Sequence, residues 1–337
     1  MTPASANPTR ADGRNIGDRL IGSEYFVLLL CVAACFAFAP FTSGFASTGN
    51  FLNIVTACLP LLLLATGQTP VLVTGGIDLS ITAIVGLSST VGALVMGGEQ
   101  GWLRGSPAAT PVAIAAMLGT GALVGFFNGA CIAWLRMPAF MVTLASMMFF
   151  NGLAVWLSHV VVKAENIYNL PAAFLVLGQK PWLASILAIL AAMGAHLLLT
   201  RTLLGRWIHA IGHNPRASHI SGVPVAGVTA TTYVLSGLFA GMASILLTAR
   251  LETGSPNHGK SLLLDVIGAA VIGGTSLFGG KGKVIWTVYG VLFLSLLSNG
   301  FNLLNLSDFI ITIVKGAVIL IAALLDIWRR TKLVRAF

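Results

Sequence analysis

The sequence of 337 residues contains very little charge. Asp, Glu, Lys and Arg together make up 9% of the chain, against roughly 25% in an average soluble domain, and the mean hydropathy is +0.91. So few charges could not cover the surface of a soluble fold of this size, because apolar atoms already dominate ordinary protein surfaces. The composition therefore excludes a soluble protein and predicts an integral membrane protein built as one membrane domain.

Cysteine is also scarce, and the four cysteines form no pattern. Cys31, Cys35, Cys58 and Cys131 all lie within apolar runs, so the sequence has neither a disulfide framework nor the paired spacing of a zinc site. Cys31 and Cys35 share one helix face, where we expect apolar packing rather than metal binding. No nucleophile–base pair or cluster of metal ligands is visible elsewhere. We therefore expect a chain that is not an enzyme and binds no cofactor or metal itself.

Apolar runs dominate what is present. Ten segments are long enough, or nearly so, to span a bilayer as a helix, which predicts an all-α polytopic fold with about ten transmembrane helices. The eighth begins near Asp265 and ends among glycines, so it fits a broken or re-entrant helix. The run Gly67–Pro70 predicts a kink or an unwound turn in the second. The ten segments are 25–41, 51–73, 79–96, 111–135, 139–157, 182–199, 225–248, 262–278, 284–304 and 309–327.

Acidic residues are outnumbered, 10 against 19 Lys and Arg, which gives a net charge of +9. In a membrane chain such a surplus collects in cytoplasmic loops. With the N-terminus inside, ten spans place thirteen basic residues in cytoplasmic segments and five outside, with Lys315 inside the last span. This bias supports the span count and puts both termini in the cytoplasm. The expected organisation is a cytoplasmic tail over 1–23, a single transmembrane domain over 24–328 whose longest cytoplasmic loop is 201–224, and a cytoplasmic tail over 329–337.

That long loop contains the signals of a complete short helix. Asn214 is a good N-cap and Pro215 suits the first helical position, while Gly222 suits the residue after the helix end. The few residues between these caps are too few for a helix that is stable alone in water. The helix must therefore dock, either on its own bundle at the lipid interface or, as we favour, on a cytoplasmic partner. Its expected apolar face consists of Ala217, Ile220 and Val223.

Two glycine-rich segments interrupt the apolar pattern. In Thr74-Gly-Gly-Ile-Asp-Leu-Ser80, Asp78 directly precedes an apolar run, and we expect it to be a helix N-cap. The alternative is a direct role in a transport path or gate. The second segment, 264–282, is rich in glycines that permit positive φ and close backbone approach. Because non-helical backbone at membrane depth must be covered by protein or water, we expect this segment at a helix or subunit interface near the pathway.

One motif is misleading. Residues 254–261, Gly-Ser-Pro-Asn-His-Gly-Lys-Ser, match the G-x-x-x-x-G-K-[ST] phosphate loop letter for letter. That loop works between a strand and a helix of a soluble α/β domain, whereas this run follows a membrane span and falls on the external side. We expect no ATP site here.

Ionisable residues inside the spans, the usual sign of ion-coupled transport, are few, and the main ones are Lys315 and His196. This scarcity argues against a proton-coupled carrier. Small residues are more regular, and their spacing predicts tight helix crossings, either within the chain or across a dimer. These glycines are Gly121, Gly125 and Gly129 in the fourth span and Gly237 and Gly241 in the seventh.

Together these segments resemble one family, the permease subunits of bacterial ATP-binding-cassette sugar importers of the ribose-type branch, which includes permeases for ribose, xylose, arabinose, galactosides and autoinducer-2. The similarity extends in order from the second span to the C-terminus. The matching pieces are 74–80, 205–222, 264–280, Ser298-Asn-Gly-Phe-Asn-Leu-Leu304 and Ile313-Val-Lys-Gly-Ala-Val-Ile319.

The resemblance implies a permease domain that passes a monosaccharide or similar small polar solute inward by alternating access. Its expected partners are a cytoplasmic ATPase that binds ATP and Mg, a second permease chain in a homo- or heterodimer, and a periplasmic solute-binding protein, at the bacterial inner (plasma) membrane. The expected ATPase-coupling residues are Gly205, Asn214, Pro215, Arg216, Ala217, Ile220 and Gly222. Within the matching pieces, the candidate pathway or gate residues are Gly76, Asp78, Ser80, Gly273, Gly274, Asn299 and Asn302.

Two other classes of transporter remain as alternatives. One is a related permease for nucleosides or branched-chain amino acids. The other is an ion-coupled secondary carrier, which matched broken helices in inverted repeats would indicate, and the sequence shows no clear pair of these.

Overall fold

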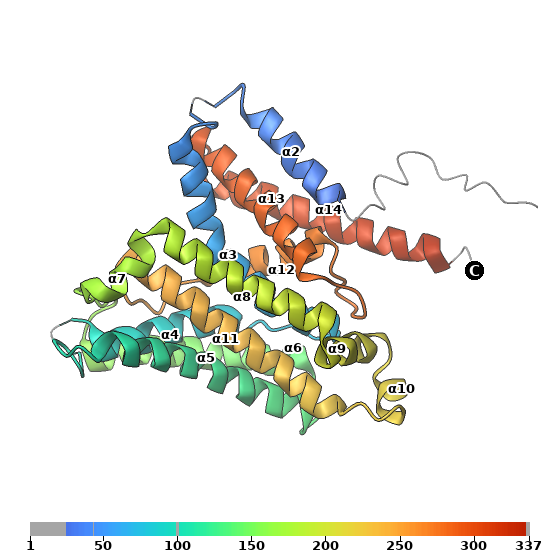
Figure 1. The fold of residues 1–337 in the computed structure, drawn as a ribbon, viewed down its shortest axis with the longest axis horizontal. Helices are drawn as coiled ribbons and strands as arrows, with labels where there is room; N and C mark the ends of the chain where they lie inside the picture. The colour runs from blue at the N-terminus through green and yellow to red at the C-terminus, as the bar shows by residue number, and fades with distance from the viewer. Residues whose placement is uncertain (1–24, 43, 99–100, 335–337) are drawn as a thin grey trace, which may run out of the picture.

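The computed structural model describes residues 25–42, 44–98 and 101–334, and each of the ten predicted segments is a helix in it (Figure 1). Six helices are long and apolar enough to cross a membrane, and α2 and α4 are shorter apolar helices. The predicted all-α polytopic membrane fold is confirmed. The ten helices are α2 (Phe26–Phe38), α3 (Thr48–Val73), α4 (Ile81–Met96), α5 (Ala109–Ala133), α6 (Ala139–Trp156), α8 (Pro181–Arg201), α11 (Val225–Leu251), α12 (Leu263–Gly273), α13 (Val284–Leu303) and α14 (Asp308–Val334).

Shorter elements connect these helices. They are a π-helical turn (Leu157–Val162), α7 (Ala172–Gln179), α9 (Leu203–His213), α10 (Pro215–Ile220) and a 3₁₀ turn (Lys260–Leu262). Within the described ranges, β structure is limited to one isolated antiparallel bridge between Ile167 and Gly254. The predicted tail over 1–23 lies outside the described residues. The predicted tail over 329–337 begins as a continuation of α14, and its last three residues are again outside them.

The helices form two groups joined by α3. One group contains α4, α5, α6 and α11, and the other contains α2, α12, α13 and α14. α3 contacts α11 in the first group and α12 and α13 in the second, with α8 packed beside it. α9 and α10 lie at one end of the molecule and α7 at the other (Figure 1).

The core centres on α4, of which every residue except Val91 is buried. Close backbone packing beside it holds α5 against α11. A Cβ on Gly121 would overlap the carbonyl group of Gly237, and one on Gly125 would overlap that of Tyr233. The glycine spacing therefore serves helix packing within the chain, the first of the two alternatives drawn from the sequence.

Two local predictions about the spans have different outcomes. α12 has only 11 residues and ends at Gly274, whose φ is +111°. It rises roughly 16 Å, about half of the 30 Å hydrocarbon core, so the expectation of a broken helix is confirmed. The unwound turn expected at Gly67–Pro70 is wrong, because α3 is helical throughout. Each proline removes one intrahelical hydrogen bond, and the packing that buries every residue from Cys58 to Val73 keeps the helix intact.

Candidate functional site

The predicted short helix is confirmed as α10. The Asn214 side chain is its N-cap and accepts a hydrogen bond from the backbone N–H of Ala217 at 3.0 Å. Pro215 is the first helical residue, and Gly222 follows the helix end with φ +81°. Each capping residue therefore holds the position that its chemistry favours.

The outer face of α10 is exposed. Arg216, Ala217 and His219 are exposed, and Ile220 is 86% exposed. The inclusion of Val223 in this face was wrong, because Val223 is buried and packs into the main core. The chain turns at Gly222 toward α11, so the next side chain points inward. What remains is a short helix presenting an isoleucine between basic groups, with no protein against it.

The segments around 74–80, 205–222 and 274–283 meet beside α9. Gly280 N–H donates to the Val73 carbonyl at 2.8 Å. A Cβ on Gly212 would overlap both that carbonyl and the Gly280 nitrogen, and one on Gly279 would lie 3.0 Å from the Gly212 carbonyl oxygen and the Gly75 nitrogen. We call Gly75, Gly212, Gly279 and Gly280 the glycine junction. It joins the end of α3, the α9–α10 unit and the loop between α12 and α13 through backbone contacts.

Other contacts keep α9 on this junction. The His209 ring nitrogens lie 2.8 Å from the Gly205 carbonyl oxygen and 3.1 Å from that of Gly282. Gly205 sits at the corner between α8 and α9, where a Cβ would overlap the Leu199 carbonyl. A displacement of α10 would therefore reach α3 and α13 through packed backbone rather than through a flexible linker.

Asp78 lies next to the junction and is fully buried. Its Oδ1 accepts from the backbone N–H of Ser80 at 3.0 Å and from the Ser80 hydroxyl at 2.6 Å, and its Oδ2 accepts from the Ser236 hydroxyl at 2.8 Å. Asn128 of α5 donates to Ser80 at 2.7 Å, and Ser146 of α6 donates to Asn128. Burial raises the pKa of the Asp78 carboxyl, and the hydrogen bonds from Ser80 and Ser236 oppose that shift.

The expectation that Asp78 is the N-cap of the third span was wrong. α4 begins at Ile81 with Ser80 before it, so Asp78 lies one residue too early and closes a turn on Ser80 instead. The Gln68 amide lies against the Asp78 backbone, 3.0 Å from its N–H and 3.3 Å from its carbonyl in the orientation that pairs both groups. The carboxylate therefore ties α11 to the start of α4, and through Ser80 it is linked to α5 and α6. A lone Gln in the second span was the available signal for this network.

The pathway candidates separate into two groups. Gly76, Asp78 and Ser80 lie at the α9 end, and a Cβ on Gly76 would lie 2.5 Å from the Tyr233 hydroxyl. At the opposite end of α3 and α13, Asn299 and Asn50 exchange two amide hydrogen bonds of 2.8 and 3.0 Å. The remaining candidates lie elsewhere: Asn302 is exposed, Gly273 packs against the Trp286 carbonyl and Gly274 follows the end of α12.

The sequence analysis did not foresee one ion pair. Lys315 Nζ of α14 lies 2.8 Å from Asp265 Oδ2 of α12, and the two side chains are 19% and 13% exposed. Each residue was noticed separately inside an apolar segment. Opposite charges in two apolar segments are the signal that could have paired them.

The run 254–261 is not placed like a phosphate loop, because it follows α11 and precedes a 3₁₀ turn. Lys260 Nζ donates to Asn257 Oδ1 at 2.6 Å within the run itself. The run lies along α4, where His258 Nδ1 is 3.1 Å from Ser89 Oγ. Burial lowers the pKa of His258 to about 4. Among the described residues, no three His, Cys, Asp or Glu side chains are grouped as metal ligands.

Comparison with known proteins gives the family. Residues 50–323, from α3 into α14, match the family described as branched-chain amino acid transport system / permease component. The chain belongs to this permease family. It is thus a multi-pass membrane permease, as its composition and helices indicate.

Curated relatives cover most of the permease. The ribose import permease protein RbsC of Escherichia coli (strain K12) is 35% identical over 89% of this chain and 91% of the relative. That of Bacillus subtilis (strain 168) is 39% identical over 82% and 84%. The galactose/methyl galactoside import permease protein MglC of Haemophilus influenzae is 32% identical over 90% and 92%. No solved structure matches the chain.

Proposed function

We propose that this permease is the membrane subunit of an ATP-binding-cassette importer that moves a monosaccharide or similar small polar solute into the cytoplasm. The names of its relatives favour a sugar, since they are import permeases for ribose and for galactose and methyl galactoside, and a xylose permease of Escherichia coli is 29% identical. The family description names branched-chain amino acids, so an amino acid is the competing solute.

The exposed helix α10 carries the proposal. A helix of 6 residues cannot be stable alone, and its capping fixes it in a shape that leaves Ile220 uncovered. Such a rigid apolar projection between Arg216 and His219 suits insertion into a groove of a cytoplasmic ATPase. The coupling residues are Gly205, Asn214, Pro215, Arg216, Ala217, Ile220 and Gly222.

The glycine junction provides the mechanical link. ATP binding closes the ATPase pair and displaces α10, and α9 passes that displacement to the end of α3 and the start of α13. The bundle then exchanges between two packed arrangements that open on opposite sides. The permease itself performs no covalent chemistry, and ATP and Mg are bound by the ATPase. Gly76, Asp78, Ser80, Gly273, Gly274, Asn299 and Asn302 are the pathway or gate residues of this proposal.

The assembly contains a second permease chain and a periplasmic solute-binding protein in addition to the ATPase. It lies in the bacterial inner membrane with both termini cytoplasmic. Cysteine labelling of intact cells tests the orientation: a cysteine at Lys163 is labelled from outside and one at Arg216 is not. Labelling at Arg216 would overturn the topology.

The coupling assignment is tested at Ala217. Ala217→Glu places an unpaired charge in the ATPase groove, which costs several kcal/mol of docking free energy. We expect loss of ATP-driven uptake into vesicles and loss of ATPase co-purification, with normal membrane insertion. Ala217→Ser is the matched control and retains both. Wild-type co-purification together with normal uptake by Ala217→Glu would refute the assignment, and uptake of labelled ribose, xylose, galactose and leucine by the wild type separates sugar from amino acid.

A further inference from the structure

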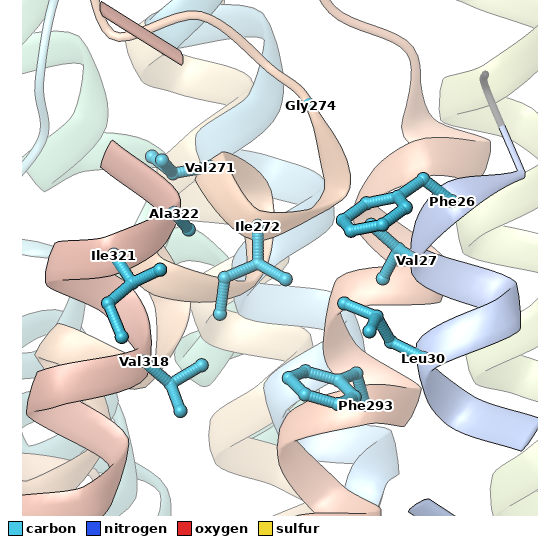
Figure 2. A pocket seen from close by; sticks show the side chains of 10 residues that line it. All are labelled: Phe26, Val27, Leu30, Val271, Ile272, Gly274, Phe293, Val318, Ile321 and Ala322. Atoms are coloured by element: carbon cyan, nitrogen blue, oxygen red, sulfur yellow. The ribbon is translucent and has the colours of Figure 1, made fainter. Parts of the chain in front are cut away.

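An apolar cavity of about 240 Å³ lies between α2, α12, α13 and α14. Figure 2 shows Phe26 and Leu30 of α2 on one side, Val318 of α14 on the other, and Ile272 and Phe293 between them. The cavity exists because α12 ends at Gly274, which lines it, after only 11 residues. A short helix leaves hydrocarbon-depth space that no backbone fills, and such space favours apolar material over water.

Basic side chains lie at the Gly274 end of this cavity. The Trp286 ring is 3.8 Å from the point where a Cβ on Gly274 would be. Over the same ring stand Lys281 Nζ, 5.5 Å from its centroid, and Lys283 Nζ, 4.7 Å from it. The cavity thus passes from an apolar interior to two ammonium groups within one side-chain layer.

The sequence adds positive charge at the same membrane face. α13 begins there, α2 begins there and α14 ends there, because consecutive spans alternate in direction. Arg14 and Arg19 precede α2, and Arg329 and Arg330 fall near the end of α14. In the orientation proposed above, this is the cytoplasmic face, whose leaflet carries the anionic lipids that attract such clusters.

We propose that the cavity holds an acyl chain of an anionic phospholipid, whose headgroup phosphate lies beside Lys281 and Lys283. The apolar lining suits the acyl chain, and the two ammonium groups suit the phosphate. The site is separate from α10 and does not depend on the identity of the transported solute.

The test uses the purified full-length permease in detergent, titrated with phosphatidylglycerol and phosphatidylcholine and read by native mass spectrometry. Phosphatidylglycerol is retained preferentially. The double variant Lys281→Gln, Lys283→Gln lowers that preference by roughly 25-fold, about fivefold for each lysine. Lys163→Gln, an exposed lysine of the opposite face, leaves the preference unchanged.

A second variant tests the acyl-chain part. Ala322→Trp fills the cavity from α14 and reduces retention of both lipids equally, while Leu320→Trp on the exposed face of the same helix does not. A thermal midpoint within the range of the controls shows that each variant is folded. An unchanged preference in the double variant overturns the proposal. So does stronger lipid retention after deletion of residues 1–24, or exclusion of lipid on dimerisation, since the occupant would then be that segment or a second copy.

Discussion

The two ends of the bundle are held together by different means. At the α9 end, the glycine junction joins three segments mainly through backbone atoms, with the Gly280 N–H bonded to the Val73 carbonyl. At the α7 end, side-chain hydroxyls hold the run 254–261 against α4. There Thr248 and the Ser255 N–H both donate to Ser89 Oγ, at 2.7 and 3.1 Å.

This difference gives the two ends different vulnerabilities. Backbone contacts tolerate no added side chain but are indifferent to pH. The hydroxyl cluster depends on His258: because Ser89 Oγ already accepts two hydrogen bonds, its own proton must go to His258 Nδ1, which requires a neutral imidazole. Close packing therefore suits the end that would transmit force from α10, while the other end is sensitive to protonation.

The largest expected effect is at Gly212. Gly212→Val sets a side chain against the Val73 carbonyl and the Gly280 nitrogen, and neither backbone atom can move away cheaply. We expect a loss of about 3 kcal/mol in the free energy of unfolding and loss of uptake. Gly227→Val is the control, because nothing lies within 4 Å of a Cβ there. Equal thermal midpoints for both variants would show that the junction is not tightly packed.

Asp78 should give the next largest effect and shows how far the α9 end also relies on side chains. Asp78→Ala strands the hydroxyls of Ser80 and Ser236, which now donate to it. The expected cost is about 2 to 3 kcal/mol of stability, measured by thermal unfolding in detergent. Asp78→Asn keeps the acceptor for Ser80 and should lose less. A milder effect for alanine than for asparagine would contradict this account.

Acid should loosen the α7 end. The pKa of His258 falls from 6.5 to about 4 on folding, so the folded state binds fewer protons, and stability is lost as pH falls through the window from 6.5 to 4. At pH 5 the loss is about 2 kcal/mol relative to pH 7. His258→Asn keeps an acceptor for Ser89 but cannot titrate, so its thermal midpoint should fall less between pH 7 and pH 5. An identical fall in the two proteins would remove His258 as the cause.

The smallest effect is expected at Lys260. Its ammonium bonds to Asn257 on an exposed part of the run. Lys260→Ala should leave ATP hydrolysis by the assembled transporter within about twofold of the wild type, whereas a true phosphate-loop lysine is needed for chemistry. ATP hydrolysis by this chain alone, abolished by the substitution, would restore the phosphate-loop interpretation.

Local signals in the sequence were the most reliable guide. The cap at Asn214, the proline at 215 and the positive φ at Gly222 all depend on residues within one turn. Hydropathy located all ten helices for a similar reason, because each span must satisfy its own backbone hydrogen bonds. The family resemblance added the sugar-permease interpretation, which the curated relatives support.

Predictions that depended on a distant partner succeeded less often. Val223 was assigned to the exposed face of α10, but it is buried in the main core once the chain turns at Gly222. Asp78 was assigned to the nearest helix, but its carboxylate also bonds Ser236, 158 residues away. The Asp265–Lys315 pair joins residues 50 positions apart.

The sequence by itself determined that this chain crosses a membrane many times, where its helices lie and how α10 is capped, since hydrophobicity and capping act over a few residues. Only the tertiary structure decided that 74–80, α9 and 274–283 form one junction and that His258 seals the opposite end. Those contacts depend on which helix faces fit together at close range, and a glycine or a serine carries no mark of the segment it will meet.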